Sequence, residues 1–355
     1  MAPLIKKIAL ASGLTPSVYV TAQHREMLDE VLEVFEIKAD FDLDLMRPRQ
    51  DLFSLTSGIL NGLKDVFTAD KPDMVLVHGD TTTSVVAAQA AFYLKIPIGH
   101  VEAGLRTYNK YSPFPEEMNR TLIGSLADLH FAPTQINFDN LLKENIPKSN
   151  VFLTGNTIVD ALHWVLDKKE EAALPNGVDL SAKTVLLTTH RRENFGQPLV
   201  RIFKAILEAS ARHPEFQIVY PVHPNPQVSR VAYEMLSGQK GILLIDPVTY
   251  PTLLSLMKRS QFVITDSGGI QEEAPCLAKP VIVLRESTER PEAVMKGAAH
   301  LAGSHDSVIL ETFSRLTCER EVTYQNAQKV SQVYGDGNAC GKIIGAIDGY
   351  FAHVT

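Results

Sequence analysis

The chain has few cysteines, one tryptophan and no long apolar run. The three cysteines are far apart and odd in number, and no CxxC or Cys/His metal spacing surrounds them; they are Cys276, Cys318 and Cys340. We therefore expect reduced thiols, no metal site and a cytoplasmic location. No stretch reaches the ~18 apolar residues that a membrane-spanning helix requires, so we expect no contact with a membrane.

An excess of positive charge is also missing. The 355 residues carry a net charge of −7 at pH 7, which excludes a general nucleic-acid footprint. An anionic ligand would have to be met by a local group of basic residues. Neither a Walker A motif nor a GxGxxG motif occurs, so the sequence signals neither an ATPase nor a dinucleotide site.

Short apolar runs alternate with segments of helical period, and this pattern predicts an α/β fold with parallel sheets. Expected strands are Val18–Thr21, Met74–Val77, Ile96–Val101, Val151–Thr154, Val185–Thr188, Gln217–Val222, Ile242–Ile245, Phe262–Thr265 and Val281–Leu284. Expected helices include His24–Phe35, Thr81–Leu94, Leu199–Arg212 and Thr252–Arg259. The pattern restarts after a polar stretch at 168–183, so we expect two Rossmann-like domains in tandem with a ligand cleft between them.

The domain boundaries follow from this pattern. We expect an N-terminal domain over residues 1–167 with the catalytic carboxylates and a nucleotide-binding domain over 168–337. A last helix over 338–355 is expected to pack back on the N-terminal domain.

Charged residues of the first half gather where strands are expected to end. Asp80 follows an apolar strand and Gly79, at the start of a helix with a threonine-rich first turn. This Asp is either a helix cap or a functional carboxylate, with about equal weight on each. Glu102 also stands at a strand end. Glu116 and Glu117 begin a helix after two prolines, and one of the two is expected to serve only the helix dipole.

The second half shows two further clusters. His190 follows its first strand and suits proton transfer near neutral pH, and Arg191 and Arg192 suit phosphate oxygens. A surface salt-bridge cluster is the competing interpretation. Asp266-Ser267-Gly268-Gly269 lies between a strand and a helix, as in a phosphate-binding loop. Glu273, one turn into that helix, could accept two hydrogen bonds from a ribose, whereas Asp266 could serve only to cap the turn.

These motifs together resemble the bacterial non-hydrolysing UDP-N-acetylglucosamine 2-epimerases over nearly the whole chain. The matching segments are VTAQHREMLDEVL, HGDTTT, GHVEAGLRT, YSPFPEEMNR, TGNTIVDAL, THRREN, YPVHPNP, DSGGIQEEAP, RESTERPEAV and YGDGNAC. The resemblance implies a GT-B fold, a homodimer and interconversion of UDP-GlcNAc and UDP-ManNAc, with neither a metal nor a redox cofactor.

The resemblance also implies roles for single residues. The matches to catalytic positions are Asp80, Glu102, Glu116 and His190. Those to uridine, ribose and diphosphate contacts are Ser267, Gly268, Gly269, Glu273 and Arg290. Positions that hold a second, activating UDP-GlcNAc in bacterial members correspond to Gln23, His24, Arg25, Gln50 and His223.

One departure concerns the start of the chain. Members of the family begin with a strand and a loop that reads roughly G-T-R-P-E-A-I-K, followed by a segment like Met1–Leu4. The central first strand, with its arginine and lysine, is thus absent from this sequence. We expect that the sequence begins at an internal methionine of a longer gene product, or that it has been truncated.

The expected reaction is elimination of UDP to 2-acetamidoglucal followed by re-addition, which supplies ManNAc units for surface polysaccharide. Three alternatives stay open at this point. The chain could be a hydrolysing epimerase that releases ManNAc and UDP, a GT-B glycosyltransferase, or a catalytically silent UDP-sugar-binding protein.

Overall fold

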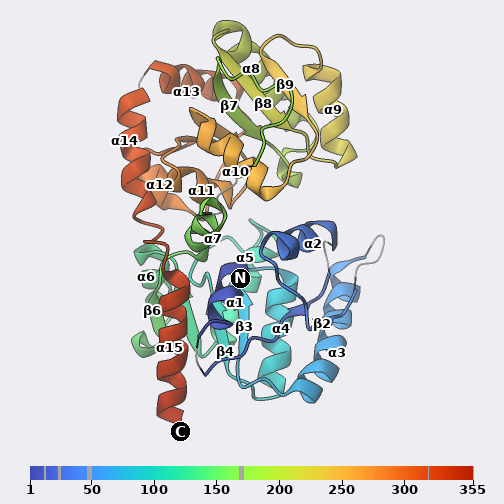
Figure 1. The fold of residues 1–355 in the computed structure, drawn as a ribbon, viewed down its shortest axis with the longest axis vertical. Coiled ribbons are helices and arrows are strands. Elements are labelled where there is room, and N and C mark those ends of the chain that lie inside the picture. The colour runs from blue at the N-terminus through green and yellow to red at the C-terminus, as the bar shows by residue number, and fades with distance from the viewer. Residues whose placement is uncertain (12, 23–24, 46–49, 168–171, 319, 355) are drawn as a thin grey trace. The chain divides into compact units, whose positions relative to one another are not determined.

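The computed structural model describes residues 1–11, 13–22, 25–45, 50–167, 172–318 and 320–354. This part of the chain divides into two compact units. Unit 1 comprises Met1–Trp164 and Gly335–Thr355, and unit 2 comprises Val165–Tyr334. Each unit has parallel strands with helices beside them (Figure 1). The expected α/β class with two Rossmann-like halves, as in the GT-B fold, is confirmed.

Unit 2 contains a parallel six-stranded sheet in the order β12-β11-β10-β7-β8-β9. Its strands are β7 (Lys183–Thr188), β8 (Phe216–Pro221), β9 (Ile242–Ile245), β10 (Phe262–Thr265), β11 (Val281–Val283) and β12 (Ala299–Leu301). The strand order reverses between the neighbours β7 and β10. Open α/β sheets bind ligands at such a reversal, beyond the carboxyl ends of the strands. The segments after Thr188 and Thr265 are therefore the place to look for a site.

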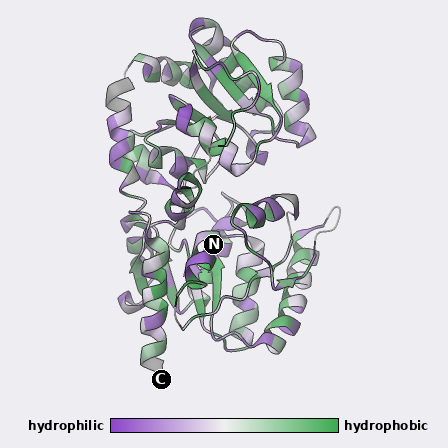
Figure 2. Cartoon of the chain, viewed as in Figure 1, coloured by the Kyte–Doolittle hydropathy of each residue, from purple (hydrophilic) through white to green (hydrophobic). Residues whose placement is uncertain are grey.

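The helices of unit 2 cover this sheet, and their apolar faces complete its core. They are α8 (Gln197–Arg212), α9 (Pro226–Leu236), α10 (Tyr250–Arg259), α11 (Ile270–Cys276), α12 (Pro291–Met295), α13 (Asp306–Cys318), α14 (Arg320–Ser331) and the short 3-10 helix η2 (Arg192–Asn194). Val185 and Leu187 of β7 lie in one cluster with Ile202 and Ile206 of α8. Strands buried on both faces read as continuous apolar runs, which Figure 2 shows as green segments.

The strands of unit 1 form two separate parallel sheets. β1 (Tyr19–Val20) pairs with β2 (Phe41–Asp42), and a second sheet has the order β3-β4-β5-β6. The strands of the second sheet are β3 (Val75–His78), β4 (Ile98–Val101), β5 (Leu129–Ala132) and β6 (Val151–Leu153). Within the described residues, β3 pairs with β4 alone. A side-chain contact links the residue after β1 to the first turn of α4, because Thr21 Oγ1 lies 3.0 Å from Thr83 Oγ1.

The helices of unit 1 come from both ends of the chain. They are α1 (Ala2–Ile8), α2 (Arg25–Val34), α3 (Leu52–Asp70), α4 (Thr82–Tyr93), α5 (Glu116–Leu126), α6 (Gln135–Lys143), α7 (Thr157–Leu166), α15 (Ala339–Val354) and the 3-10 helix η1 (Lys148–Asn150). Leu4 of α1 and Ile343 of α15 share a buried cluster with Val101 and Phe131. The C-terminal helix thus packs on the sheet that carries the first half of the sequence.

The strands and helices expected from the sequence are present, each with ends shifted by no more than two residues. Three strands, β2, β5 and β12, were not predicted, and neither was α3. β5 reads Leu-His-Phe-Ala, and its histidine interrupts the apolar run. None of the described helices is long and apolar enough to cross a membrane.

Glycine fixes the turn that follows β4. Gly104 has a φ of +90°, and a Cβ atom there would lie 2.2 Å from the carbonyl oxygen of Asn137. The side chain of Asn140 donates a hydrogen bond to the Gly104 carbonyl (3.0 Å). Only glycine can approach α6 so closely with this φ. The turn is therefore tied to α6, which fixes where the chain goes after Glu102.

Candidate active site

Asp80 lies in the short turn between β3 and α4. The strand ends at His78, Gly79 has a φ of +65°, and α4 begins at Thr82. The N-cap of α4 is Thr81, whose hydroxyl accepts a hydrogen bond from Ser84 N (3.2 Å). The interpretation of Asp80 as the helix cap is therefore wrong. Its side chain is left for other partners.

Three side chains from α5 and β4 hold this turn. Asn119 donates a hydrogen bond to the Asp80 carbonyl (2.7 Å), and Arg120 forms an ion pair with the Asp80 carboxylate (2.5 Å). His100 Nε2 lies 2.8 Å from the Gly79 carbonyl, so it must be the protonated nitrogen that donates. The backbone and the side chain of Asp80 are thus fixed separately.

His100 is fully buried and neutral. Burial lowers its pKa to about 3, an effect that the bond to Gly79 only partly offsets. Its parallel-strand neighbour His130 is also buried, and burial lowers the pKa of that imidazole to about 4. Both Nδ1 atoms are buried without a hydrogen-bond partner among the described residues. A neutral imidazole can therefore hold the turn without placing a further charge beside Asp80.

Glu102 lies directly after β4, on the strand next to the one that leads to Asp80. It has a φ of +64°, which is unusual for a residue other than glycine. Its Oε2 atom lies 3.7 Å from His78 Nε2 and would be 3.0 Å from a Cβ atom on Gly79. The expected gathering of carboxylates at the ends of β3 and β4 is therefore present for Asp80 and Glu102.

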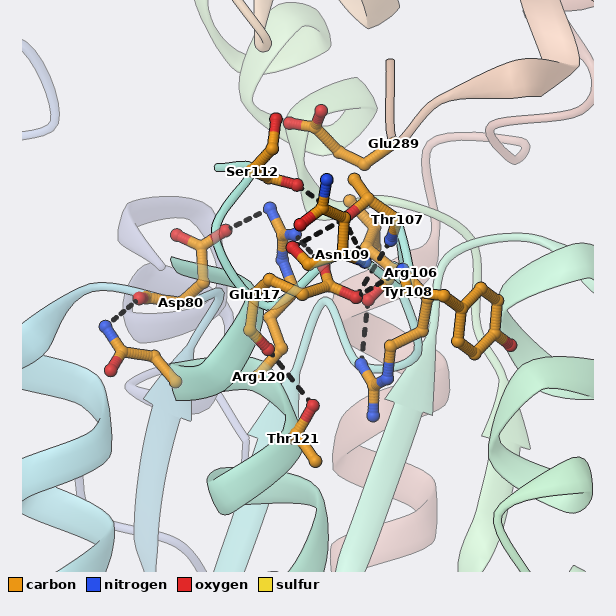
Figure 3. A network of polar contacts seen from close by, with 12 residues as sticks. Asp80, Arg106, Thr107, Tyr108, Asn109, Ser112, Glu117, Arg120, Thr121 and Glu289 are labelled. Carbon is orange, nitrogen blue, oxygen red and sulfur yellow. Dashed lines mark hydrogen bonds and ion pairs between the residues drawn. The ribbon is translucent and has the colours of Figure 1, made fainter. Parts of the chain in front are cut away.

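The adjacent glutamates of α5 have different surroundings. Glu117 is buried, and its carboxylate accepts hydrogen bonds from Thr107 N (2.9 Å) and Tyr108 N (2.8 Å) and pairs with Arg120 (3.0 Å) (Figure 3). Glu116 is half-buried, and its Oε2 atom has no hydrogen-bond partner among the described residues. Glu117 therefore has a definite structural task, and Glu116 is the one left with unused hydrogen-bonding capacity.

His190 and Asp266 meet at the strand-order reversal of unit 2. They follow the neighbouring strands β7 and β10, and His190 Nδ1 lies 3.2 Å from Asp266 Oδ1. The fully buried Asp266 carboxylate also accepts hydrogen bonds from the backbone N–H groups of His190 and Arg191 and from Asn194. Burial alone would raise the pKa of Asp266, but the contact with the His190 imidazole, together with these bonds, holds that pKa below its usual value.

This contact orients the imidazole of His190. With Nδ1 turned towards a carboxylate, Nε2 is the nitrogen that can meet a ligand. The ring also stacks on His223 with centroids 5.9 Å apart. The sequence suggested for Asp266 only a role in capping the turn. Its contact with His190 could have been inferred only from the pairing of β7 with β10.

The two arginines after His190 differ in position. Arg191 points towards the glycine loop, where its Nη2 atom would be 3.3 Å from a Cβ atom on Gly268. Its Nε atom is buried and has no hydrogen-bond partner among the described residues. Arg192 is exposed in η2. Of the two, only Arg191 is thus placed beside the loop after β10.

The loop after β10 carries the expected Ser267, Gly268 and Gly269. Ser267 N donates a hydrogen bond to Thr265 Oγ1 (2.9 Å), and Gly269 precedes α11 with open space where a Cβ atom would be. Arg290 also borders Gly268, but its guanidinium is paired with Glu272 (2.7 Å) and Glu289 (2.5 Å). Any anion that Arg290 binds would have to compete with these carboxylates.

Glu273 is buried on α11. Its Oε1 atom accepts a hydrogen bond from the hydroxyl of Tyr250 (2.8 Å), and burial raises the pKa of this carboxyl above its usual value. Tyr250 thus occupies one oxygen of the residue that the sequence assigns to a ribose.

The residues expected to bind a second ligand are spread over both units. Gln23 and His24 lie outside the described residues. Arg25 pairs with Asp42 (2.6 Å) and Asp44 (2.8 Å), and Gln50 stands just before Asp51, the N-cap of α3. No group of three or more His, Cys, Asp and Glu side chains in the described part of the chain could hold a metal ion.

Comparison with known proteins gives a consistent result. A family model described as UDP-N-acetylglucosamine 2-epimerase matches residues 6–348. A UDP-N-acetylglucosamine 2-epimerase of Yersinia pestis is 49% identical over 355 residues, which cover 98% of this chain and 94% of that protein. The family model and the relative each match nearly the whole chain, so the similarity is not limited to one domain.

Solved structures agree with this. The crystal structure of UDP-GlcNAc 2-epimerase from Neisseria meningitidis bound to UDP-GlcNAc has a TM-score of 0.92 and 47% identity, and covers 98% of this chain and 95% of that one. The Methanocaldococcus jannaschii UDP-GlcNAc 2-epimerase in complex with UDP-GlcNAc and UDP has a TM-score of 0.81 and 30% identity, with 98% and 95% covered.

The buried His100 predicts a pH-dependent stability. Its folded pKa lies below that of a free histidine, so the unfolded chain binds the proton more tightly. The stability contribution is complete above about pH 6.5 and is lost as the pH falls towards about 3. Between pH 7 and pH 5 the stability of the native chain relative to His100→Gln should fall by about 2 kcal/mol.

The fluorescence of Trp164, the single tryptophan, reports the urea unfolding of unit 1. The exposed His163, whose replacement by Gln should leave the pH dependence unchanged, is the control. A difference between the native chain and His100→Gln that does not change with pH would show that His100 takes up a proton in the folded state.

Proposed function

Because the chain belongs to the UDP-N-acetylglucosamine 2-epimerase family, we propose that it interconverts UDP-GlcNAc and UDP-ManNAc by inverting C2 of the sugar. The observation that carries the proposal is the pair of carboxylates Asp80 and Glu102 at neighbouring strand ends, in a chain that matches the family along its whole length. The remaining assignments follow from what this reaction demands.

The proton on C2 cannot be removed directly, because no carbonyl group adjoins that carbon. The C1–O bond must break first, and its electron pair leaves with UDP. The resulting positive charge at C1 acidifies the C2 proton, which a carboxylate accepts while the C2–H electron pair forms the C1=C2 double bond of 2-acetamidoglucal. Return of the diphosphate to C1 and of a proton to the other face of C2 gives the epimer.

We assign proton transfer to unit 1. Asp80 and Glu102 are the carboxylates for the two faces of the sugar, and Glu116 tunes one of them through its negative charge. Carboxylates also stabilise the positive charge that develops at C1. The buried and unpartnered oxygen of Glu116 supports this assignment, because a group with unused hydrogen-bonding capacity can accept a bond from the substrate.

We assign nucleotide binding to unit 2. His190, oriented by Asp266, and Arg191 meet the departing diphosphate beside Ser267, Gly268 and Gly269. Glu273 accepts hydrogen bonds from the ribose hydroxyls, which requires the hydroxyl of Tyr250 to move or to share this carboxylate. Arg290 supports the glycine loop and reaches the diphosphate only if it leaves Glu272 or Glu289.

We further propose that a second, activating UDP-GlcNAc binds to five residues, namely Gln23, His24, Arg25, Gln50 and His223. The stacking of His223 on His190 supports it, because a ligand at His223 would alter the surroundings of His190 directly. At Arg25, the ligand would have to displace Asp42 or Asp44.

We also propose a homodimer and a cytoplasmic location. α5 presents an exposed apolar row formed by Phe114 just before it and by Met118 and Leu122 within it, and Phe92 and Tyr93 are exposed on the neighbouring α4. Apolar residues gathered in this way are typical of a protein interface. All three cysteines are free thiols, as is usual in the cytosol.

Incubation of the protein with UDP-GlcNAc in D₂O tests the proposed function. The expected products are UDP-ManNAc and UDP-GlcNAc with deuterium at C2, since each turnover exposes the C2 position to a solvent-derived proton. Proton NMR and mass spectrometry of the nucleotide sugars measure both. Deuterated free ManNAc with UDP would identify a hydrolysing epimerase. Unlabelled sugar would contradict epimerisation and leave a glycosyltransferase or a silent binding protein.

The contrast between Arg191 and Arg192 gives a second prediction. Arg191→Gln should weaken UDP binding by about 10- to 100-fold, because it removes a charge-assisted hydrogen bond worth ~1.5–3 kcal/mol. Arg192→Gln should weaken it by less, since an exposed ion pair contributes under ~1 kcal/mol. Isothermal titration calorimetry with UDP measures both, with Arg230→Gln on the exposed face of α9 as the control. A larger loss for Arg192→Gln would reverse this assignment.

A further inference from the structure

Arg120 is a buried cation between two carboxylates. Its side chain is 3% exposed and comes from α5. One Nη atom lies 2.5 Å from Asp80 Oδ2 and the other lies 3.0 Å from Glu117 Oε2. An arginine keeps its charge in proteins, so a buried guanidinium must be compensated by an anion. Here two anions compensate it, and one of them is a proposed proton-transfer group.

The two carboxylates differ in how much solvent they meet. The Glu117 side chain is 4% exposed, and its other oxygen accepts hydrogen bonds from Thr107 N and Tyr108 N. The Asp80 side chain is 25% exposed. Glu117 is therefore the fixed partner of Arg120, and Asp80 is the partner that a substrate can still reach.

We propose that Arg120 is the positioning residue for Asp80, and that Glu117 holds Arg120 in place throughout the catalytic cycle. The proposal rests on the epimerase function. Arg120 fixes one oxygen of Asp80 and favours its ionised form, which is the form that can accept the C2 proton. Asn119, one residue earlier on α5, fixes the carbonyl of Asp80. One helix thus orients both the side chain and the backbone of Asp80.

The role of Glu117 follows from the charge balance during turnover. When Asp80 accepts the C2 proton, its negative charge disappears and its attraction for Arg120 weakens. A buried guanidinium with no other anion would then be strongly destabilised. Because the carboxylate of Glu117 also contacts it, Arg120 keeps a partner in both protonation states of Asp80. The cost of protonating Asp80 is smaller than it would be for an isolated ion pair.

Other charged groups near Asp80 bear on any titration of it. Arg120 and Glu117 face it from α5, and His78 comes from the end of β3. β4 and its turn contribute His100, which is neutral, and Glu102. α4, over Thr82–Tyr93, carries no charged residue.

Arg120→Gln and Glu117→Gln should move the pH profile in opposite directions. Without the guanidinium, Asp80 holds its proton more strongly, so the acid limb of kcat/KM should shift up by at least ~1 pH unit. Without the Glu117 charge, Arg120 has one carboxylate fewer beside it and attracts the ionised form of Asp80 more strongly, so the acid limb should shift down. In the Glu117→Gln variant, the side-chain amide oxygen can still accept the bonds from the loop at 107–108. Arg120→Lys should restore part of the loss in kcat, because it returns the charge.

A double-mutant cycle separates positioning from support of the fold. Asp80→Asn should lower kcat by ~10²–10⁴ if Asp80 transfers the proton. Adding Arg120→Gln to it should cost less than about threefold more, because both changes remove the same function. The comparison is Arg106→Gln, since Arg106 is equally buried and forms its ion pair with Glu144 instead of Asp80. Its effect should multiply with that of Asp80→Asn.

The proposal would be overturned if the acid limb of kcat/KM did not move in Arg120→Gln and if the effects of Arg120→Gln and Asp80→Asn on kcat simply multiplied. Arg120 would then be a purely structural residue. The carboxyl carbon resonance of Asp80, followed by NMR in carbon-13-labelled protein, gives a readout that needs no turnover. Its titration midpoint should fall in Glu117→Gln, a variant that keeps the buried arginine, and an unchanged midpoint would also overturn the proposal. A native chain that exchanges no C2 proton in D₂O would instead overturn the epimerase function and leave the NMR result interpretable.

Discussion

The arrangement of unit 1 depends on a buried guanidinium that cannot lose its charge. Arg120 requires anions, and the two that compensate it come from the turn after β3 and from its own helix. α5 is thereby tied to Asp80 by side chain and backbone and, through Glu117, to the loop at Thr107. The positions of the proposed catalytic carboxylates follow from this electrostatic requirement, because removing either anion would leave the cation undercompensated.

In unit 2 the buried charged side chain beside the strand ends is an anion, Asp266. Asp266 follows β10, and hydrogen bonds from the backbone of His190 and Arg191 and from Asn194 stabilise its charge. The same carboxylate orients the imidazole of His190. In both units a buried charged side chain therefore orients a neighbouring functional group: Arg120 orients Asp80, and Asp266 orients His190. Both functional groups follow the carboxyl end of a strand, which is where open parallel sheets bind ligands. The loops that carry the proposed functional residues are thus held by side chains from neighbouring helices and strand ends.

The sequence predicts the strand ends well and the side-chain partners poorly. Apolar runs locate β3, β4, β7 and β10, so the placing of Asp80, Glu102, His190 and the glycine loop at strand ends could be derived in advance. The function of Asp266 could not, because it depends on β10 lying beside β7 across a sequence separation of 77 residues. That Thr81 rather than Asp80 caps α4 depends on backbone geometry, since both residues are common caps.

Arg120 is an instructive case among the residues that were missed. Its spacing of three from Glu117 is that of an ordinary surface pair on a helix, which contributes only ~0.2–0.5 kcal/mol. The burial of both side chains and the third partner, Asp80, change its meaning, and neither can be read from the spacing. The different exposures of Arg191 and Arg192 could not be predicted from the sequence either, because the two arginines are adjacent. The 3-10 helix η2 turns the Arg192 side chain outwards and leaves Arg191 beside Gly268.

The central claim is that the C1–O bond breaks and reforms while carboxylates of the chain move the C2 proton. Positional isotope exchange tests it most directly. UDP-GlcNAc with oxygen-18 in the bridge between C1 and the β-phosphorus is incubated with the protein, and phosphorus-31 NMR follows the label. The account predicts that the label moves into the non-bridging β-phosphoryl positions of the nucleotide sugars as the epimers interconvert. Epimerisation with the label retained in the bridge would contradict it, because the C1–O bond would then have stayed intact.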